Sequence, residues 1–498
     1  MTRSSWMDDE YFEEHKLGID THALVYAAIH ALSKQSTPTI ALMGSGGWNT
    51  LFCIEFPDGD KILARIPKIG GRSTDKIHST VAIMTMARYH LQLPVPEIFA
   101  WHPSNDNAVG APYILLEFVD GIEPWQRWFT LPFKGQITIL DELAKYHAKF
   151  AQPLPFNGIG SIFFAPNLPD SSNLASISTY RLGRISHGHP YTPDRAISES
   201  SLPLIHTPTL REFWQRRWQH ECDHIIQTHG VDRETVIADD REGQTVGAFL
   251  DVAEDLKTLV WNTPLPNHLE LYEPCLAMTD YAFRNIKIDP ETLRVTSFLD
   301  WDDVYVFPFL LCSRFPEDIC FFDGSGEPWY KTGAFTFVPL DEEPHDLDDF
   351  NLEDPIDGPQ CVEQRDNPSA EQSDDCSSEE PTSDDELSSD TEDQSDQISS
   401  EGSVPESPEA SPAPFPDDVD TTEYDRKRRI RDTLLRREYA RLLAQHDPRY
   451  GLEGFFTLRT EPMKIHYLVM NGWKSWLQKD EWLKERAEEI RRLSIVQV

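Results

Sequence analysis

Three residues with oxygen-bearing side chains stand at a spacing suited to metal-dependent group transfer. Asp280 precedes Asn285 in the pattern Asp-x4-Asn, and Asp300 follows fifteen residues later within Phe-Leu-Asp-Trp-Asp-Asp. Phosphoryl transfer from ATP needs one carboxylate to orient or deprotonate the acceptor hydroxyl, plus an amide oxygen and a second carboxylate for Mg²⁺. Asp280, Asn285 and Asp300 would supply that set. Taken alone, however, Asp-x4-Asn is more often a solvated Asp followed by an Asn in a turn.

A short glycine-rich stretch and a basic residue lie upstream of these residues. The stretch separates two runs with strand character and consists of Gly44, Ser45, Gly46 and Gly47. Glycines there would let backbone N–H groups approach phosphate oxygens, and a hairpin marked by Asp58-Gly59 then leads to Arg65. A glycine cluster by itself is usually only a turn. The order of loop, hairpin and cation is what favours a nucleotide site.

The surrounding pattern predicts an α+β fold that would hold these residues. Residues 37–66 have the character of antiparallel strands, a helix begins near Ser73, and two further strands follow before Gly121. Beyond Gly121, apolar residues recur at helical spacing. Helices are expected at 136–151, 210–229, 243–261, 426–446 and 480–493, with a strand hairpin between 281 and 303. His147, on the first of these helices, is interpreted as a structural histidine with its hydrogen bonds satisfied.

Negative charge is concentrated in one segment of the chain. The formal net charge of the 498 residues is −39, and residues 341–424 hold about 30 of the 84 acidic side chains against a single Arg. The segment is rich in Ser, Asp, Glu and Pro and poor in large apolar residues. We therefore predict a disordered acidic insertion, after which further helices complete the large lobe.

Composition also bears on partners and location. A field of this sign disfavours nucleic acid and anionic membranes, and no apolar run is long enough for a membrane span. The N-terminal residues have neither an apolar signal core nor an Arg-rich transit composition, so the expected location is the cytoplasm or the nucleus. The seven cysteines form no CxxC pair and are interpreted as reduced thiols.

Taken in order, the motifs resemble the aminoglycoside phosphotransferase/choline kinase-like family, in particular its large fungal branch. The resemblance runs from about Thr37 to Pro308 and rests on the segments GSGGWNTLFCIEFPDGDKILARIP, PVPEIFAWH, GAPYILLEFVDG, LAKYHAKFAQPLPFNGIGSI, TDYAFRNIKID and VTSFLDWDD. It implies a protein-kinase-like bilobal fold, with a small antiparallel β lobe plus one helix and a mainly α-helical large lobe. It does not imply an acceptor, because this fold serves many acceptors.

The resemblance also implies roles for individual residues. Asp280 matches the catalytic Asp of the family, whereas Asn285 and Asp300 match its Mg²⁺ ligands. Arg65 stands where the family has a phosphate-binding Lys, and the stretch Gly44 to Gly47 would cover the nucleotide phosphates.

Three departures from the family pattern concern the supporting residues. Met278 stands where the family has a His that braces the catalytic loop, and Arg65 offers a planar fork in place of an ammonium point charge. Thr80 occupies the helix position at which the family has a Glu to pair with that cation. Because Thr cannot form the ion pair, Glu97 and Asp75 are candidate partners of Arg65.

Two functions remain open at this point. Since the catalytic Asp and both metal ligands are retained, the first is an ATP- and Mg²⁺-dependent phosphotransferase that moves the γ-phosphoryl group to a hydroxyl of a small molecule. The alternative is a pseudokinase or scaffold that uses the fold, the acidic insertion and the basic run at 426–431 for partner binding. The acidic insertion itself has two interpretations: it only keeps the protein in solution, or it folds back on the basic helix and masks it.

The predicted organisation has five parts. They are an N-terminal leader and helix (1–36), a kinase-like small lobe (37–119), a large lobe with the catalytic and metal loops (120–340), the acidic insertion (341–424), and C-terminal helices that complete the large lobe (425–498).

Overall fold

The computed structural model describes residues 17–68, 73–166, 173–186, 209–237, 243–312, 315–319 and 421–496. The acidic insertion expected at 341–424 lies outside the described residues, apart from 421–424, which already form the start of a helix. Contacts divide the chain into a unit of residues 357–425 and a second unit made of residues 1–356 and 426–498. All contacts reported below belong to the second unit.

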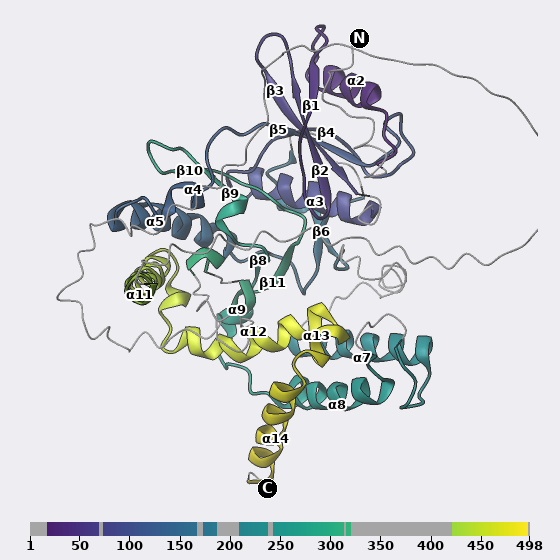
Figure 1. Cartoon of the computed structure of the whole chain (residues 1–498), viewed down its shortest axis with the longest axis vertical. Coiled ribbons are helices and arrows are strands. Elements are labelled where there is room, and N and C mark those ends of the chain that lie inside the picture. Colours follow the sequence, from purple (N-terminus) through teal and green to yellow (C-terminus); the bar gives the residue numbers. More distant parts are fainter. Residues whose placement is uncertain are drawn as a thin grey trace, which may run out of the picture. The chain divides into compact units, whose positions relative to one another are not determined.

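A five-stranded antiparallel sheet forms the small lobe (Figure 1). In spatial order its strands are β1 (Thr39–Ser45), β2 (Asn49–Glu55), β3 (Lys61–Pro67), β5 (Tyr113–Glu117) and β4 (Ile98–His102). Alternate residues of β2 are buried, as a strand with one covered face requires. Gly59 has a φ of +93° in the β2–β3 turn, which explains why Asp58-Gly59 marks this hairpin in the sequence.

Two helices pack on this sheet. α2 (Thr21–Ala31) belongs to an apolar cluster that includes Phe52 of β2. α3 (Thr74–Tyr89) belongs to a different cluster through Val81, together with residues of β5. The side chain of Ser73 accepts a hydrogen bond from the backbone of the first turn of α3, as its cap-type sequence predicts. The small lobe is therefore antiparallel strands plus packed helices.

The large lobe is mainly helical. Its helices are α4 (Trp125–Trp128), α5 (Phe133–Phe150), α7 (Leu210–His229), α8 (Val246–Asn262), α9 (Phe309–Cys312), α11 (Thr421–His446), α12 (Phe455–Asn471), α13 (Trp473–Leu477) and α14 (Asp480–Val496). Within the described part of the chain, every helix is too short or too polar to cross a bilayer. The α+β, protein-kinase-like class predicted from the sequence is confirmed.

Three small antiparallel sheets join the helices of the large lobe. They pair β6 (Ser161–Phe164) with β7 (Tyr180–Gly183), β8 (Pro274–Met278) with β11 (Val304–Pro308), and β9 (Ile286–Ile288) with β10 (Val295–Phe298). The β9–β10 hairpin is the one expected between 281 and 303. Since β8 and β11 flank this hairpin and pair with each other, the loops after β8 and after β10 are brought to the same region.

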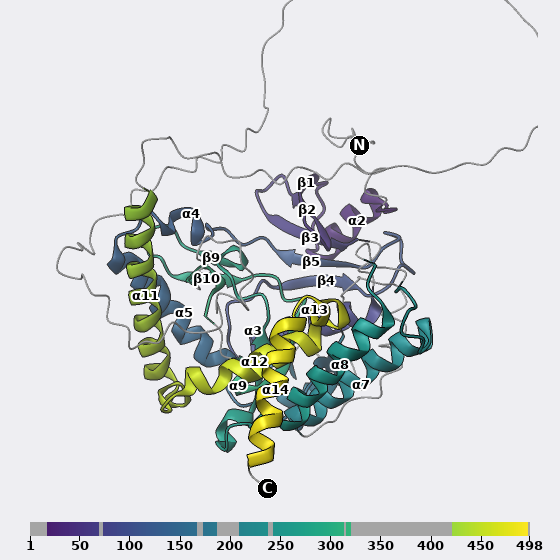
Figure 2. The same ribbon diagram turned by 60° about the horizontal axis from the view of Figure 1, so that its bottom comes forward.

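Helices from the end of the chain complete the core of the large lobe. Figure 2 shows α11 beside α5, and the buried side chain of Arg431 in α11 donates to the carbonyl of Leu131 at 2.7 Å and to Gln136 of α5 at 2.7 Å. Further along, Trp476 of α13 stacks on Phe249 of α8 with ring centroids 5.9 Å apart. Arg431, the last residue of the basic run noted in the sequence, thus packs inside the large lobe.

His147 of α5 is buried between aromatic rings. It contacts Tyr281 and Tyr450, with ring centroids 5.3 and 5.9 Å away, and among the described residues its Nε2 atom has no hydrogen-bond partner. The interpretation as a structural histidine agrees with this burial, but the expected full hydrogen bonding does not. Burial and the nearby Arg459 lower the pKa of His147 to about 3.

We expect this histidine to make the fold sensitive to mild acid. Between the ordinary pKa of 6.5 and the folded value of about 3, the unfolded chain binds a proton that the folded protein does not, so the free energy of unfolding falls as pH falls. From about pH 6.5 to about pH 5 the loss from His147 is about 2 kcal/mol. Urea unfolding of the wild type and of His147→Phe at both pH values measures it, and an equal pH dependence in the two proteins would contradict it.

Candidate active site

The loop after β8 brings Asp280 and Asn285 together. Asn285 lies in a short 3-10 turn, Phe283–Asn285, that leads directly into β9, and its side chain is buried. Its amide nitrogen donates to the carboxylate of Asp280 at 2.8 Å and to the backbone carbonyl of the same residue at 3.0 Å. Since the amide nitrogen is engaged by Asp280, the amide oxygen of Asn285 is the atom available to a metal ion.

Arg284 is a second contact of Asp280 that the sequence reasoning missed. Its guanidinium forms an ion pair with Oδ1 of Asp280, whereas Asn285 donates to Oδ2. Both side chains of this ion pair are partly exposed, so solvent weakens it. Each carboxylate oxygen has two lone pairs and can still accept a hydrogen bond from a substrate hydroxyl.

Asp300 occupies a constrained backbone position in the loop after β10. Its φ of +52° lies in the left-handed region, which Asp adopts more readily than most residues. The buried Trp301 fixes the loop, because its indole N–H donates to the carbonyl of Phe298 at 2.8 Å. The backbone N–H of Leu299 donates to the carbonyl of Asn285 at 2.7 Å, which holds the two loops against each other.

Carboxylates crowd around Asp300. Partial burial raises the pKa of Asp300, Arg65 lowers it, and the charges of Asp302, Asp303 and Asp280 raise it further. Oδ1 of Asp300 lies 3.4 Å from the guanidinium of Arg65. A divalent cation at this position would relieve the repulsion among these carboxylates.

The donor set fits Mg²⁺ better than a metal held entirely by protein. Among the described residues, no group of three or more His, Cys, Asp or Glu side chains is arranged to hold a metal ion. Mg²⁺ is commonly held by one or two protein oxygens, with waters and substrate phosphates completing its coordination. One carboxylate from Asp300 and one amide oxygen from Asn285 match that requirement.

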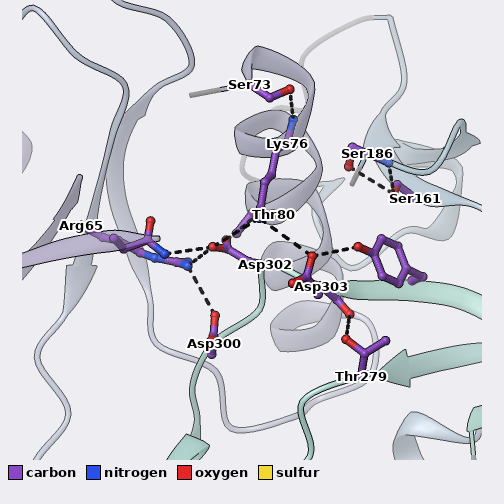
Figure 3. Close-up of polar contacts among 12 residues, drawn as sticks. Arg65, Ser73, Lys76, Thr80, Ser161, Ser186, Thr279, Asp300, Asp302 and Asp303 are labelled. Carbon is purple, nitrogen blue, oxygen red and sulfur yellow. Dashed lines mark hydrogen bonds and ion pairs between the residues drawn. The ribbon is translucent and has the colours of Figure 1, made fainter. Parts of the chain in front are cut away.

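Arg65 of β3 points from the small lobe to the loop that carries Asp300 (Figure 3). Its largely buried guanidinium forms an ion pair with Asp302 as well as with Asp300. Glu97 instead pairs with Arg88 at 3.4 Å, and Asp75 pairs with Arg184. The two partners of Arg65 considered from the sequence are therefore wrong, because each meets another arginine.

Asp302 gathers donors from three elements of the small lobe. Its Oδ2 accepts from Asn49 of β2 at 3.0 Å, and its Oδ1 accepts from Thr80 of α3 at 3.2 Å. The ammonium of Lys76 in α3 lies 3.9 Å from the same carboxylate. Burial would raise the pKa of Asp302, but Arg65 and these neighbours outweigh it and hold the pKa below its ordinary value.

Asp302, Asn49 and Lys76 were not predicted as site residues. The signal for Asp302 is its place two residues after Asp300, on the other side of the buried Trp301. A tryptophan anchored in the core between two acidic residues fixes the positions of both carboxylates on the same loop. Nothing in the sequence near Asn49 or Lys76 indicates that either side chain reaches this loop.

The glycine-rich stretch forms the turn between β1 and β2. Gly44 and Ser45 end β1, and the backbone N–H of Gly46 donates to the carbonyl of Asn49 at 2.9 Å. A Cβ atom added at Gly44 or Gly47 would meet no atom of the described residues within 4 Å. Packing among the described residues therefore does not explain these two glycines, and those residues leave the space above their backbone open to a ligand.

Met278 and Gly121 support the candidate site in different ways. Met278 is buried at the end of β8, opposite Val304 of β11, so it contributes packing where the family pattern has an imidazole. Gly121, at the connection between the lobes, has a φ of +127°, and a Cβ there would lie 2.7 Å from the carbonyl oxygen of Ile288. Only glycine fits this crossing point.

Related proteins and solved structures provide a comparison. The chain is 27% identical over 316 residues to a subtelomeric hrmA-associated cluster protein of Aspergillus fumigatus, covering 58% of this chain and 62% of the relative. It is 21% identical over 340 residues to altered inheritance of mitochondria protein 9 of Lachancea thermotolerans, covering 58% of this chain and 52% of that protein. The match thus spans less than two thirds of these relatives.

Solved structures that resemble the chain include two phosphotransferases. An ethanolamine kinase of Plasmodium vivax shares 10% sequence identity, with 63% of this chain and 68% of that chain covered and a TM-score of 0.34. The streptomycin–ATP ternary complex of APH(2″)-IIa shares 12% identity, with 62% and 76% covered and a TM-score of 0.34.

The names of the yeast relatives contradict the location in the cytoplasm or nucleus that the sequence predicted. Several of the yeast proteins that match carry the name of a mitochondrial protein. The expectation rested on the composition of the N-terminal residues, of which 1–16 lie outside the described structure. The composition of these residues therefore does not determine the compartment of the protein.

The sheet of the small lobe and the loops of the candidate site fall within the region matched by a family model. The model is that of the phosphotransferase enzyme family, and it covers residues 40–310, which is more than half of the 498 residues. The matched region begins at β1 and ends just beyond β11, so it contains both the glycine-rich turn and the loops of Asp280 and Asp300. The chain belongs to the phosphotransferase enzyme family.

Proposed function

We propose that this protein transfers the γ-phosphoryl group of ATP, in a Mg²⁺-dependent reaction, to a hydroxyl group of a small molecule. The observation that carries the proposal is the meeting of three groups at one place. Asp280 lies against Asn285, the loop of Asp300 is hydrogen-bonded to the loop of Asn285, and Arg65 reaches Asp300 from the small lobe. A carboxylate for the acceptor, oxygen ligands for the metal and a cation for phosphate are the parts that phosphoryl transfer needs.

The large-lobe residues of the candidate site have separate tasks in this proposal. Asp280 accepts the hydrogen bond of the acceptor hydroxyl and takes its proton as the hydroxyl oxygen bonds to the γ-phosphorus, while the bond from that phosphorus to the bridging oxygen breaks and ADP leaves. Asn285 keeps Asp280 oriented through its amide nitrogen and, with Asp300, provides the oxygen atoms for Mg²⁺. The metal, when bound, neutralises charge on the phosphate oxygens.

The small lobe holds the nucleotide in this proposal. Arg65 pairs with phosphate oxygens as a planar two-point donor. The turn of residues 44–47 covers the phosphates with backbone N–H groups, since no side chain at Gly44 or Gly47 occupies that space. The names of the yeast relatives direct the search for the acceptor towards mitochondrial metabolites that carry a hydroxyl group.

We expect ATP to stabilise the purified protein only when Mg²⁺ is present. Binding to the folded state alone raises the melting temperature by a few degrees at saturating nucleotide. Thermal melts with ATP, with Mg²⁺, with both and with neither provide the measurement, and screening of hydroxyl compounds for ATP consumption follows. A melting temperature unchanged in all four conditions would contradict nucleotide binding and would leave the fold as a scaffold for a partner.

A further inference from the structure

Asp302 is the most completely surrounded carboxylate of the site, and neither the family pattern nor the proposed chemistry assigns it a task. Its side chain is 10% exposed. It receives the guanidinium of Arg65, the amide of Asn49 and the hydroxyl of Thr80, with the ammonium of Lys76 close by. A buried carboxylate with this many donors is fixed in one position.

The donors come from one lobe and the acceptor from the other. Asn49, Arg65 and the two α3 residues belong to β2, β3 and α3 of the small lobe, whereas Asp302 follows β10 in the large lobe. Figure 3 shows Arg65 and Thr80 approaching Asp302 from different sides. The side chain of Asp302 in the large lobe therefore contacts three elements of the small lobe, β2, β3 and α3.

Arg65 needs such a holder because it has two different acidic neighbours. Its contact with the metal-ligand candidate Asp300 is long, at 3.4 Å, and that carboxylate is 45% exposed. Its contact with Asp302 is buried, because both side chains are only 10% exposed. A Mg²⁺–nucleotide complex that engages Asp300 would separate Arg65 from Asp300. The ion pair between Arg65 and the buried Asp302 would remain.

We infer that Asp302 is the positioning residue for Arg65, fixing its guanidinium for the nucleotide phosphates in the place of an acidic residue on α3. This inference rests on the proposed function. Thr80, the α3 residue that faces the pair, is uncharged and donates its hydroxyl to Asp302, which is consistent with the required negative charge being supplied from the metal loop. Lys76 supports the same carboxylate from the first turn of α3.

The test compares the affinity for Mg²⁺–ATP across variants of the full chain, measured by calorimetry. Asp302→Asn keeps the size of the side chain but removes its charge, and we expect a loss of affinity of about tenfold or more. In an Arg65→Ala background the same change should have little further effect, because Asp302 acts through Arg65. Glu97→Gln is the matched control, since it removes a carboxylate that pairs with Arg88, and it should bind like the wild type.

Rescue separates positioning from a general effect on folding. Thr80 Oγ1 lies 3.2 Å from Asp302, so Thr80→Glu combined with Asp302→Asn returns a negative charge within reach of Arg65, and affinity should recover to within about threefold. Wild-type affinity in Asp302→Asn, or an undiminished effect in the Arg65→Ala background, overturns the inference and leaves the proposed function intact. Absence of Mg²⁺–ATP binding in the wild type overturns both.

Discussion

Asp280→Asn is expected to abolish turnover while leaving nucleotide binding close to that of the wild type. The substitution preserves the size of the side chain but removes its ability to take the proton of the acceptor hydroxyl. Loss of a general base lowers kcat by about 10²- to 10⁴-fold. Nucleotide affinity depends in this proposal on Arg65, Asn285 and Asp300, which the substitution does not change, so the melting shift with Mg²⁺–ATP should persist.

Steady-state kinetics with the identified acceptor and melts with Mg²⁺–ATP measure the two effects separately. Asp58→Asn is a suitable control, because Asp58 lies in the β2–β3 turn, pairs with Lys34 and touches none of the site residues named above. If Asp280→Asn turned over near the wild-type rate, Asp280 could not be the general base of the reaction. Loss of nucleotide binding together with turnover would show that Asp280 supports the metal site rather than the acceptor.

Asp300→Ala should remove the dependence of nucleotide binding on Mg²⁺. Without this carboxylate the proposed metal site keeps only the amide oxygen of Asn285, which is a weak ligand by itself. The change also frees Arg65 from one of its two acidic contacts. We therefore expect the variant to bind ATP without metal at least as well as the wild type binds ATP without metal. Added Mg²⁺ should give the variant no further stabilisation.

A second variant distinguishes loss of the ligand from strain in the loop. Alanine at a φ of +52° costs about 1 kcal/mol, whereas glycine adopts this region freely. Asp300→Gly should therefore lose Mg²⁺ dependence as fully as Asp300→Ala but melt at a higher temperature than it. Melts of both variants in ATP, with and without Mg²⁺, give the result. A Mg²⁺-dependent shift in either variant would exclude Asp300 as a required ligand.

Much of the fold could be predicted because the relevant signals are local. The Asp58-Gly59 turn between alternating residues indicates the β2–β3 hairpin, and the cap residue Ser73 marks the start of α3. The hairpin between the loops of Asn285 and Asp300 likewise follows from a short stretch of sequence. Local patterns of this kind depend on neighbouring residues and hardly on the rest of the chain.

The interactions of the candidate site with its surroundings could not be predicted in the same way. Arg65 and Asp302 are 237 residues apart in the chain, and their pairing depends on how two lobes meet. The same applies to Arg431, whose buried contacts with Leu131 and Gln136 are set by the docking of α11. A basic run has the same sequence whether its side chains face solvent or are buried, so the burial of Arg431 cannot be inferred from the run itself.

The docking of the C-terminal helices also bears on how the protein is made. The hydroxyl of Tyr281, the neighbour of Asp280, lies 3.3 Å from that of Tyr439, and the two residues are 158 positions apart. At about 5–20 residues per second, a ribosome needs roughly 8–30 seconds to synthesise the intervening chain. The strands of the small lobe can assemble during that interval, but the apolar surface beneath α11, α12 and α13 stays uncovered. The loop of Asp280 therefore reaches its final packing late in synthesis, and the large lobe keeps this apolar surface exposed until the last helices have emerged.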